Sequence, residues 1–550
     1  MKSPYQRFWL LLKPDNKEIY QVYTFAVFKG IIALSLPLGI QSIINLIQAG
    51  RVSVSWVLLV SIVALGIGIG GYLQVMQIRI MENIQQNIFT RAAFDFTYRI
   101  PKIKFEEINK HFAPELVNRF FDIITLQKSV AKIMIDFSSG ILQIVFGLVL
   151  LSFYHSFFIV FSILLIVSVY SIIKFTSKKG LETSLEESKY KYKVVSWLEE
   201  LARSKDSFKL AGLTHLPESK TDQFVSGYLK SRENHFKVLK TQYILLLAFK
   251  ILITLVLLVI GGLLVLRQQM NIGQFVAAEI IILLIIDSSE KLILNLENVF
   301  DTLTSLEKVG QVLDLQLDEY NHSNSINSEI KQALDVEISG VSFTYPGRTD
   351  WVLKDVNYAF KSNQNYCITG SNGSGRSTLI HLISGLYHPQ KGNICINQLP
   401  VGNYNIADLY KIIGNGLQEE TIFEGTIFEN ITLGRSFIQT DDVLWAIEKT
   451  CLSDYIKSLP KGLDTSVDIS GNKLSKSVFQ KILLARSIVN KPKLLLLENQ
   501  LDFIVEEDRK KIIDFLTDNN NGWTFICISY DQYMMEKCET VIFLEEGKIK

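Results

Sequence analysis

The sequence predicts a protein in two parts, an α-helical domain with six membrane spans followed by a C-terminal α/β domain. Its 550 residues are 48% hydrophobic with a mean hydropathy of +0.22, and the apolar excess lies in the first 290 residues as long runs. From Asp314 the composition becomes polar and rich in Asn and Ser, and beyond it short apolar strands alternate with helical stretches. We therefore expect a membrane domain (1–314), a linker (315–333) and an α/β domain (334–550).

Six apolar segments account for the membrane domain. A spanning helix needs about 20 apolar residues, and most of the segments reach that length, while the fourth and sixth need neighbouring residues to complete them. Buried helices of a large soluble core are the alternative, but runs this long rarely occur there. We place the segments near Val22–Ile47, Val54–Ile78, Ile133–Tyr154, Phe157–Ile173, Ile244–Leu266 and Phe275–Ile286.

The loops between these segments predict the orientation. Three connections are very short, whereas 79–132 and 174–243 are long and rich in Lys and Arg, as is the N-terminus. Positive charge stays on the cytoplasmic side, so we expect the long segments and both chain ends to be cytoplasmic. Folded as an antiparallel helical pair, 79–132 would extend about 40 Å from the membrane. The formal net charge of +1 gives no basic field that would indicate nucleic-acid binding.

The α/β domain carries a glycine-rich loop, ITGSNGSGRST, at Ile368–Thr378. It differs at one position from the phosphate-binding pattern G-x-x-x-x-G-K-[ST], because Arg376 stands where the pattern has lysine. A buried strand precedes the loop and a helix follows it, which is the context in which backbone N–H groups cradle phosphates. The phosphate-binding residues that we expect are Gly370, Ser371, Asn372, Gly373, Ser374, Gly375, Arg376, Ser377 and Thr378.

Further stretches follow in a recognisable order. Tyr345 lies in FTYPG before the loop, and Gln418 lies in GLQEETIFEG after it. LSKSV then precedes QKILLARSIVNKPKLLLLEN, and Tyr530 lies in TFICISY. This order resembles the nucleotide-binding domain of ABC transporters, and six spans ahead of it resemble the exporter-type half-transporter. The resemblance runs from about Tyr20 to Lys550, and the membrane half is most similar to bacterial peptide- and protein-exporting members without an N-terminal peptidase domain.

The resemblance implies a dimer that binds ATP and Mg²⁺ between two facing nucleotide-binding domains. Tyr345 would stack on adenine, and Ser377, Gln418 and Glu498 would hold Mg²⁺. The signature motif would be Leu474, Ser475, Lys476, Ser477 and Val478, acting on the nucleotide of the partner chain. By position, Ala113–Arg119 and Arg203–Lys209 are similar to the family's coupling helices.

Several positions depart from the family pattern. Asn499 replaces the catalytic glutamate, and an amide cannot take a proton from water, so a contribution of about 10²–10⁴-fold is lost. Tyr530 replaces the switch histidine, and its phenol stays neutral near pH 7. Glu498 replaces the Walker B aspartate and is one methylene longer. Lys476 and Ser477 replace two glycines of the signature, where side chains would crowd the γ-phosphate.

Three functions remain open. The favoured one is a subunit of an ATP-dependent exporter in the bacterial inner membrane, paired with a different half-transporter that keeps intact motifs. The alternative is a non-hydrolysing, nucleotide-responsive regulator or scaffold of an export complex. A homodimeric ATPase is disfavoured, because both sites would then carry every substitution. Peptide or protein cargo and a periplasmic adaptor follow from the resemblance only, and we expect weak or absent hydrolysis by this chain alone.

Overall fold

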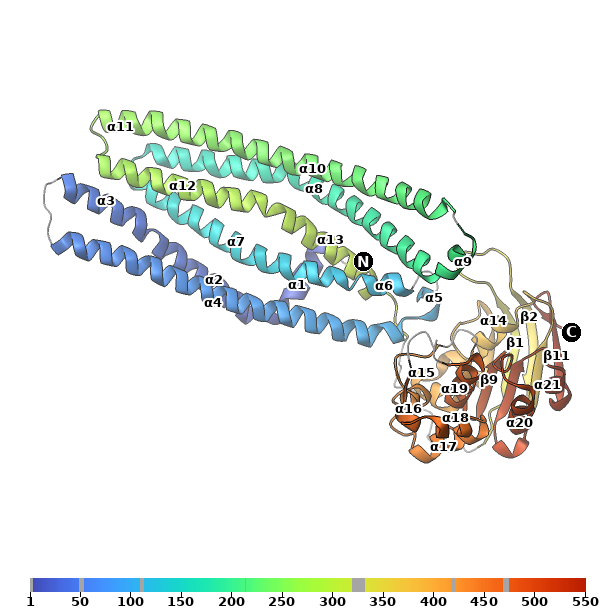
Figure 1. Cartoon of the computed structure of the whole chain (residues 1–550). Coiled ribbons are helices and arrows are strands. Elements are labelled where there is room, and N and C mark those ends of the chain that lie inside the picture. The colour runs from blue at the N-terminus through green and yellow to red at the C-terminus, as the bar shows by residue number, and fades with distance from the viewer. Residues whose placement is uncertain are drawn as a thin grey trace. The chain divides into compact units, whose positions relative to one another are not determined.

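The computed structural model describes residues 3–48, 54–108, 113–212, 214–318, 332–417, 421–467 and 474–550. It divides into two compact units, shown in Figure 1. The helical unit consists of Met1–Pro101 and His111–Leu315, and the α/β unit consists of Lys102–Lys110 and Gln316–Lys550. The short segment from Lys102 therefore belongs with the C-terminal domain, although it lies inside the region that we expected to be a membrane-domain arm.

The helical unit consists of long helices joined by short turns. Its elements are α1 (Pro4–Leu12), η1 (Lys13–Asp15), α2 (Asn16–Ala33), α3 (Ser35–Gln48), α4 (Val54–Arg99), α6 (Ala113–Asn118), α7 (Phe121–Ser152), α8 (Phe157–Arg203), α9 (Lys205–Leu210), α10 (Leu216–Val256), a π-helical turn η3 (Leu257–Gly261), α11 (Gly262–Leu266), α12 (Ile272–Leu294) and α13 (Leu296–Leu313). A short 3₁₀ turn, η2 (Ile100–Lys102), follows α4 at the boundary of the two units.

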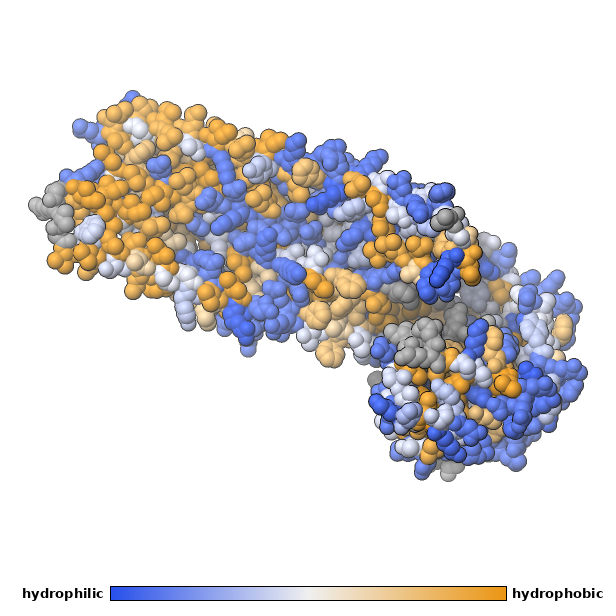
Figure 2. Space-filling view, viewed as in Figure 1, coloured by the Kyte–Doolittle hydropathy of each residue, from blue (hydrophilic) through white to orange (hydrophobic). Residues whose placement is uncertain are grey.

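The six predicted membrane spans are confirmed. Within the described residues, six helical stretches are long and apolar enough to cross a membrane. Figure 2 shows apolar surface over the end of the unit that contains α3 and α11, and more polar surface over the rest of the helices. The polar extensions are helical as expected, since α4 has 46 residues and α8 has 47.

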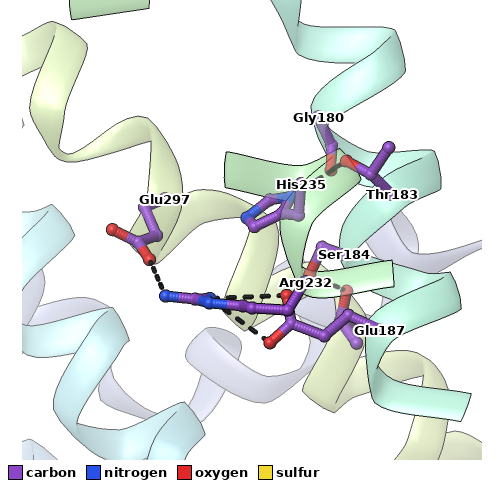
Figure 3. Close-up of polar contacts among 8 residues, drawn as sticks. Gly180, Thr183, Ser184, Glu187, Arg232, His235 and Glu297 are labelled. Atoms are coloured by element: carbon purple, nitrogen blue, oxygen red, sulfur yellow. Dashed lines mark hydrogen bonds and ion pairs between the residues drawn. The ribbon is translucent and has the colours of Figure 1, made fainter. Parts of the chain in front are cut away.

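Polar and close-packed contacts join α8, α10 and α13 in their polar extensions, outside the apolar segments of these helices. Arg232 of α10 lies between Glu187 of α8, at 3.3 Å, and Glu297 of α13, at 3.9 Å, as Figure 3 shows. The buried His235 shares a hydrogen bond of 2.9 Å with the Thr183 hydroxyl. Gly180 of α8 lies directly against the ring of Phe300, so these helices approach closely.

The α/β unit is built on two main sheets. An antiparallel sheet has the order β2-β1-β4-β5, and a six-stranded sheet has the order β12-β11-β3-β10-β9-β6, in which all neighbours except β11 and β12 are parallel. The strands are β1 (Val336–Phe343), β2 (Leu353–Phe360), β3 (Asn365–Thr369), β4 (Lys391–Ile396), β5 (Leu399–Pro400), β6 (Ile413–Gly416), β7 (Gly425–Thr426), β8 (Ser466–Val467), β9 (Leu494–Glu498), β10 (Thr524–Ile528), β11 (Thr540–Glu545) and β12 (Lys548–Ile549).

Helices cover the parallel sheet and supply two apolar cores around its central strands. They are α14 (Arg376–Ile383), α15 (Ile406–Ile412), α16 (Ile427–Thr432), α17 (Thr440–Lys449), α18 (Ser453–Ser458), α19 (Lys476–Ile488), α20 (Glu506–Leu516) and α21 (Gln532–Lys537), with 3₁₀ turns at Val401–Asn403, Gly462–Asp464 and Asn519–Asn521. Every residue of β3, β9 and β10 is buried, as expected for central strands covered on both faces.

A four-residue helix, α5 (Phe105–Ile108), packs on the α/β unit. The Phe105 ring meets the edges of Tyr387, at 5.3 Å, and His381, at 5.9 Å. Glu106 accepts a hydrogen bond of 3.4 Å from the backbone N–H of His388. The α5 segment therefore belongs to the α/β unit, whereas α6, within the coupling helix that we expected at Ala113–Arg119, belongs to the helical unit, and its role as a coupling helix stays a prediction.

Replacing Gly180 by alanine should destabilise the helical unit. The added Cβ would lie 2.3 Å from Phe300 Cζ, so the ring must shift, and overpacking of this kind costs about 1–3 kcal/mol. Thermal unfolding of the full chain in nanodiscs measures the effect. The control is Gly68→Ala, where a Cβ meets nothing within 4 Å, and it should be neutral or slightly stabilising. Phe300→Leu should restore part of the loss, and an unchanged midpoint for Gly180→Ala would contradict the packing.

Candidate nucleotide-binding site

The glycine loop follows β3 and leads into α14, as the sequence predicts. Gly370 has φ of 143°, and a Cβ there would lie 2.0 Å from the carbonyl oxygen of Leu544. Gly375 has φ of 101° and serves as the N-cap of α14, where a Cβ would lie 2.7 Å from Leu353 Cδ2. Only glycine fits these two positions, so the tight path of the loop is determined by the sequence.

Two buried polar atoms in the loop have no hydrogen-bond partner within the described residues. They are the Ser374 hydroxyl oxygen and Arg376 Nη1. An unsatisfied buried polar group costs about 1–3 kcal/mol, and phosphate oxygens arriving at this helix N-terminus would satisfy such donors. The loop therefore retains groups that fit a phosphate, even though the lysine of the pattern is absent.

Arg376 and Tyr530 contact each other, although 154 residues separate them. The guanidinium donates a hydrogen bond to the phenol oxygen and lies over the tyrosine ring at 4.4 Å from its centroid. The same phenol donates to the Gly370 carbonyl at 3.1 Å or to the Asn372 side-chain oxygen at 3.0 Å. Arg376 is 9% exposed, so the contact with Tyr530 involves a mostly buried positive charge. The loop arginine and the tyrosine at the expected switch position thus form one interaction.

Glu498 lies at the end of β9, 3% exposed, and accepts a hydrogen bond from the Ser377 hydroxyl. Its other carboxylate oxygen is 4.0 Å from His381 Nε2 on α14. The sequence paired Ser377 and Glu498 as Mg²⁺ ligands, and the structure brings their side chains together. A hydroxyl and a carboxylate are oxygen ligands of the kind that Mg²⁺ prefers.

Asn499 follows Glu498 with φ of 49°, in the left-handed region where Asn is tolerated and Glu is less favourable. Its N–H donates to the Ile528 carbonyl at 3.1 Å, so the backbone is held in register with β10.

Gln418 lies outside the described residues. Sequence reasoning missed Gln500, which is adjacent to Asn499. Its buried side chain donates to the Leu417 carbonyl at 2.8 Å and so connects the end of β9 to the residue that follows β6.

The signature residues begin α19. Ser475 is the N-cap, and its hydroxyl accepts a hydrogen bond of 3.3 Å from the Val478 N–H. The exposed Lys476 places its ammonium 4.7 Å from the centroid of Phe503. Leu474, Ser477 and Val478 are partly buried beside them. The lysine that replaces a signature glycine therefore has an aromatic contact within its own unit.

Tyr345 lies beside the loop helix. Its hydroxyl shares a hydrogen bond of 2.8 Å with the Thr378 hydroxyl, and its ring meets the edges of Phe343 and Tyr387 at 5.1 and 5.4 Å. The structure therefore groups Tyr345, Arg376, Ser377, Glu498 and Tyr530 around α14.

Comparison with known proteins agrees with this geometry. Residues 353–501 match the family model described as ABC transporter. The chain is 31% identical over 249 residues to the ATP-dependent permease MDL1 of Candida albicans, covering 44% of this chain and 36% of the permease. It is 30% identical over 299 residues to the beta-(1→2)glucan export ATP-binding/permease protein NdvA of Agrobacterium vitis, covering 54% of this chain and 50% of that protein. The chain thus spans half or less of the length of these two relatives.

The fold of the whole chain is similar to that of a bacterial Atm1-family ABC exporter solved with ATP bound. The TM-score is 0.85 at 16% sequence identity, and the match covers 97% of this chain and 94% of the other. The chain has the fold of an ABC exporter half-transporter. Its C-terminal unit has the fold of an ABC nucleotide-binding domain, a domain that implies ATP binding.

The Arg376–Tyr530 contact predicts an unusual effect of removing one hydroxyl. Tyr530→Phe should strengthen binding of a fluorescent ATP analogue about three- to tenfold, because the guanidinium loses a competing partner worth about 1 kcal/mol. In an Arg376→Lys background the same change should have little effect. Tyr533→Phe, which removes a hydroxyl bonded to Asp514 at 2.8 Å, is the control. Weaker binding by Tyr530→Phe would show that the hydroxyl contacts nucleotide.

Proposed function

We propose that this chain is one subunit of an ATP-dependent exporter in the bacterial inner membrane, in which its own phosphate loop binds Mg-ATP without hydrolysing it rapidly. The exporter fold and the export functions named for its relatives support the first part of the proposal. The lysine- and arginine-rich polar segments support a cytoplasmic position for the nucleotide-binding domain and both chain ends.

The contact between Arg376 and Tyr530 carries the second part. A histidine at position 530 could polarise the γ-phosphate, whereas the phenol here is engaged with Arg376 and the loop. Asn499 supplies no base at the adjacent position, since an amide can orient water but cannot accept its proton. Gly370, Gly373, Gly375, Ser377 and Thr378 still shape the loop. The residues therefore support binding of ATP and Mg²⁺ better than they support its hydrolysis.

A different half-transporter with intact motifs is the partner that best complements this chain. In a homodimer both sites would combine Asn499 with the altered signature. In a mixed dimer one site would use the partner's base, and Ser475, which already caps α19, would face that nucleotide. Lys476 would crowd this site, and Phe503 is an alternative position for its ammonium. A regulatory or scaffolding role is the second candidate, supported by the changes at several catalytic positions in one chain.

The cargo is proposed on resemblance alone. The membrane half resembles peptide and protein exporters, and a periplasmic adaptor would suit such a cargo. The proteins that this chain is similar to include a glucan exporter, so they support export in general and no single cargo.

The purified chain alone should hydrolyse ATP far below 1 s⁻¹, the lower end of the usual enzyme range of roughly 1–10³ s⁻¹. Phosphate release in nanodiscs at saturating Mg-ATP measures it. Asn499→Glu alone should restore little, because Tyr530 and Arg376 remain and glutamate at φ of 49° costs about 1 kcal/mol. Combining it with Tyr530→His and Arg376→Lys should raise the rate at least tenfold. A parent rate of 1 s⁻¹ or more would contradict the proposal.

A further inference from the structure

A cavity of about 400 Å³ lies in the helical unit among the α6–α7 turn, α8, α10 and α13. This volume falls in the range of roughly 300–1,000 Å³ that small-molecule sites occupy. Five cationic side chains line the cavity, against the carboxylates of Glu115 and Glu200. The cations are Arg119, Lys189, Lys193, Lys220 and Lys308. The lining therefore carries an excess of three positive charges, five minus two, in a protein whose net charge is only +1.

Two of these cations are buried together on one aromatic ring. Arg119 and Lys308 are each 9% exposed, and they lie 4.0 Å and 5.7 Å from the centroid of Tyr192. The ring offsets part of the cost of burial, but like charges on a shared ring repel each other. Lys189 and Lys193 are exposed and Lys220 is half-buried, so they form the rim around this buried pair.

The hydrogen bonds of the buried pair are incomplete. Arg119 donates through Nη2 to Glu115 at 2.8 Å, while its Nε and Nη1 atoms are buried and have no acceptor among the described residues. Lys308 forms no ion pair within 4.0 Å with any described residue, and burial lowers its pKa although the carboxylates of Asp122 and Glu307 act in the opposite direction. Arginine presents a planar fork that suits bidentate binding of phosphate or carboxylate oxygens. A small anion would satisfy both needs, the missing acceptors and the missing negative charge.

The polar cluster around Arg232, on the same three helices, differs from the cavity in its charge balance. Arg232 has both Glu187 and Glu297 within 4.0 Å, as Figure 3 shows, so its charge is neutralised by protein groups. The five cavity cations face two lining carboxylates, and the buried Asp122 also lies beside Tyr192, from whose hydroxyl it accepts a hydrogen bond. Among the described residues the cations still outnumber these acids, which favours an anionic ligand.

The distance from the membrane distinguishes a soluble ligand from a lipid headgroup. Lys189 lies 16 residues beyond Ile173, the expected end of the apolar run in α8. At 1.5 Å per residue this is about 24 Å along the helix. Lys220 lies 24 residues before Ile244 in α10, or about 36 Å. These distances favour an anion from the aqueous phase.

We propose that this cavity is a binding site for a soluble phosphate-bearing anion with two or more negative charges, held by Arg119 and Lys308 at its floor and by the rim lysines. The site is independent of the ATP site on the α/β unit. Occupation would bridge α8, α10 and α13, so binding would stabilise the packing of these helices.

Calorimetric titration of tripolyphosphate into the full chain in phosphatidylcholine nanodiscs tests the proposal. Arg119→Gln or Lys308→Met should weaken binding at least tenfold, and the exposed Lys193→Gln about threefold, with thermal unfolding used to confirm folding. Lys205→Gln on α9, whose side chain is 73% exposed, should change affinity less than twofold. Arg376→Ala with Ser377→Ala should remove any tripolyphosphate binding at the phosphate loop and leave the affinity of the cavity unchanged.

Three results would overturn the proposal. The first is no measurable heat from the parent protein at millimolar tripolyphosphate. The second is a loss of binding in the wrong variant: an equal loss in Lys205→Gln would show general attraction to surface charge, and a loss only in the phosphate-loop variant would place the binding at the ATP site. The third is competition by nanodiscs containing phosphatidylglycerol, which would identify the ligand as a lipid headgroup.

Discussion

The contact between Arg376 and Tyr530 is the interaction on which the character of the nucleotide site depends. It joins the two positions that we interpret as the loop lysine and switch histidine of the ABC pattern, and the phenol also reaches the backbone of the phosphate loop at Gly370. Together they give the mostly buried guanidinium a hydrogen bond through Nη2 and an aromatic face, while Nη1 has no partner among the described residues. We infer that the contact with Tyr530 holds the loop, so that a nucleotide must compete with Tyr530 for Arg376. This competition favours a site that binds ATP more readily than it hydrolyses ATP.

A second series of contacts connects the docked helix α5 to the same site. Phe105 meets the ring of His381, which lies on the phosphate-loop helix, and His381 Nε2 is 4.0 Å from the carboxylate of Glu498. The α5 segment and the Glu498–Ser377 pair therefore both contact the phosphate-loop helix, and His381 lies between them.

Local patterns predicted much of the architecture but little of the contact geometry. Apolar run length predicted the six spans, and glycine spacing predicted the loop between β3 and α14, because both are properties of short segments. The Arg376–Tyr530 contact could not be predicted, since it depends on β10 pairing with β3 in a register that places Ile528 beside Ile368. We expected a coupling helix at Ala113–Arg119. The contact of α5 with Tyr387 was not predicted, because position along the arm does not show which turn packs on that ring. Gln500 was missed because its partner, the Leu417 carbonyl, belongs to a distant strand end.

The central claim is that this chain holds ATP without cleaving it, and one photolabelling measurement tests it most directly. Native membranes containing the chain and its partner are incubated with an azido-ATP that carries the label on either the α- or the γ-phosphate, then irradiated, and the two subunits are separated. We expect equal α- and γ-label on this chain, because the terminal phosphate stays attached to bound nucleotide. Strong α-label with the γ-label lost from this chain would show hydrolysis at its own phosphate loop and would contradict the account.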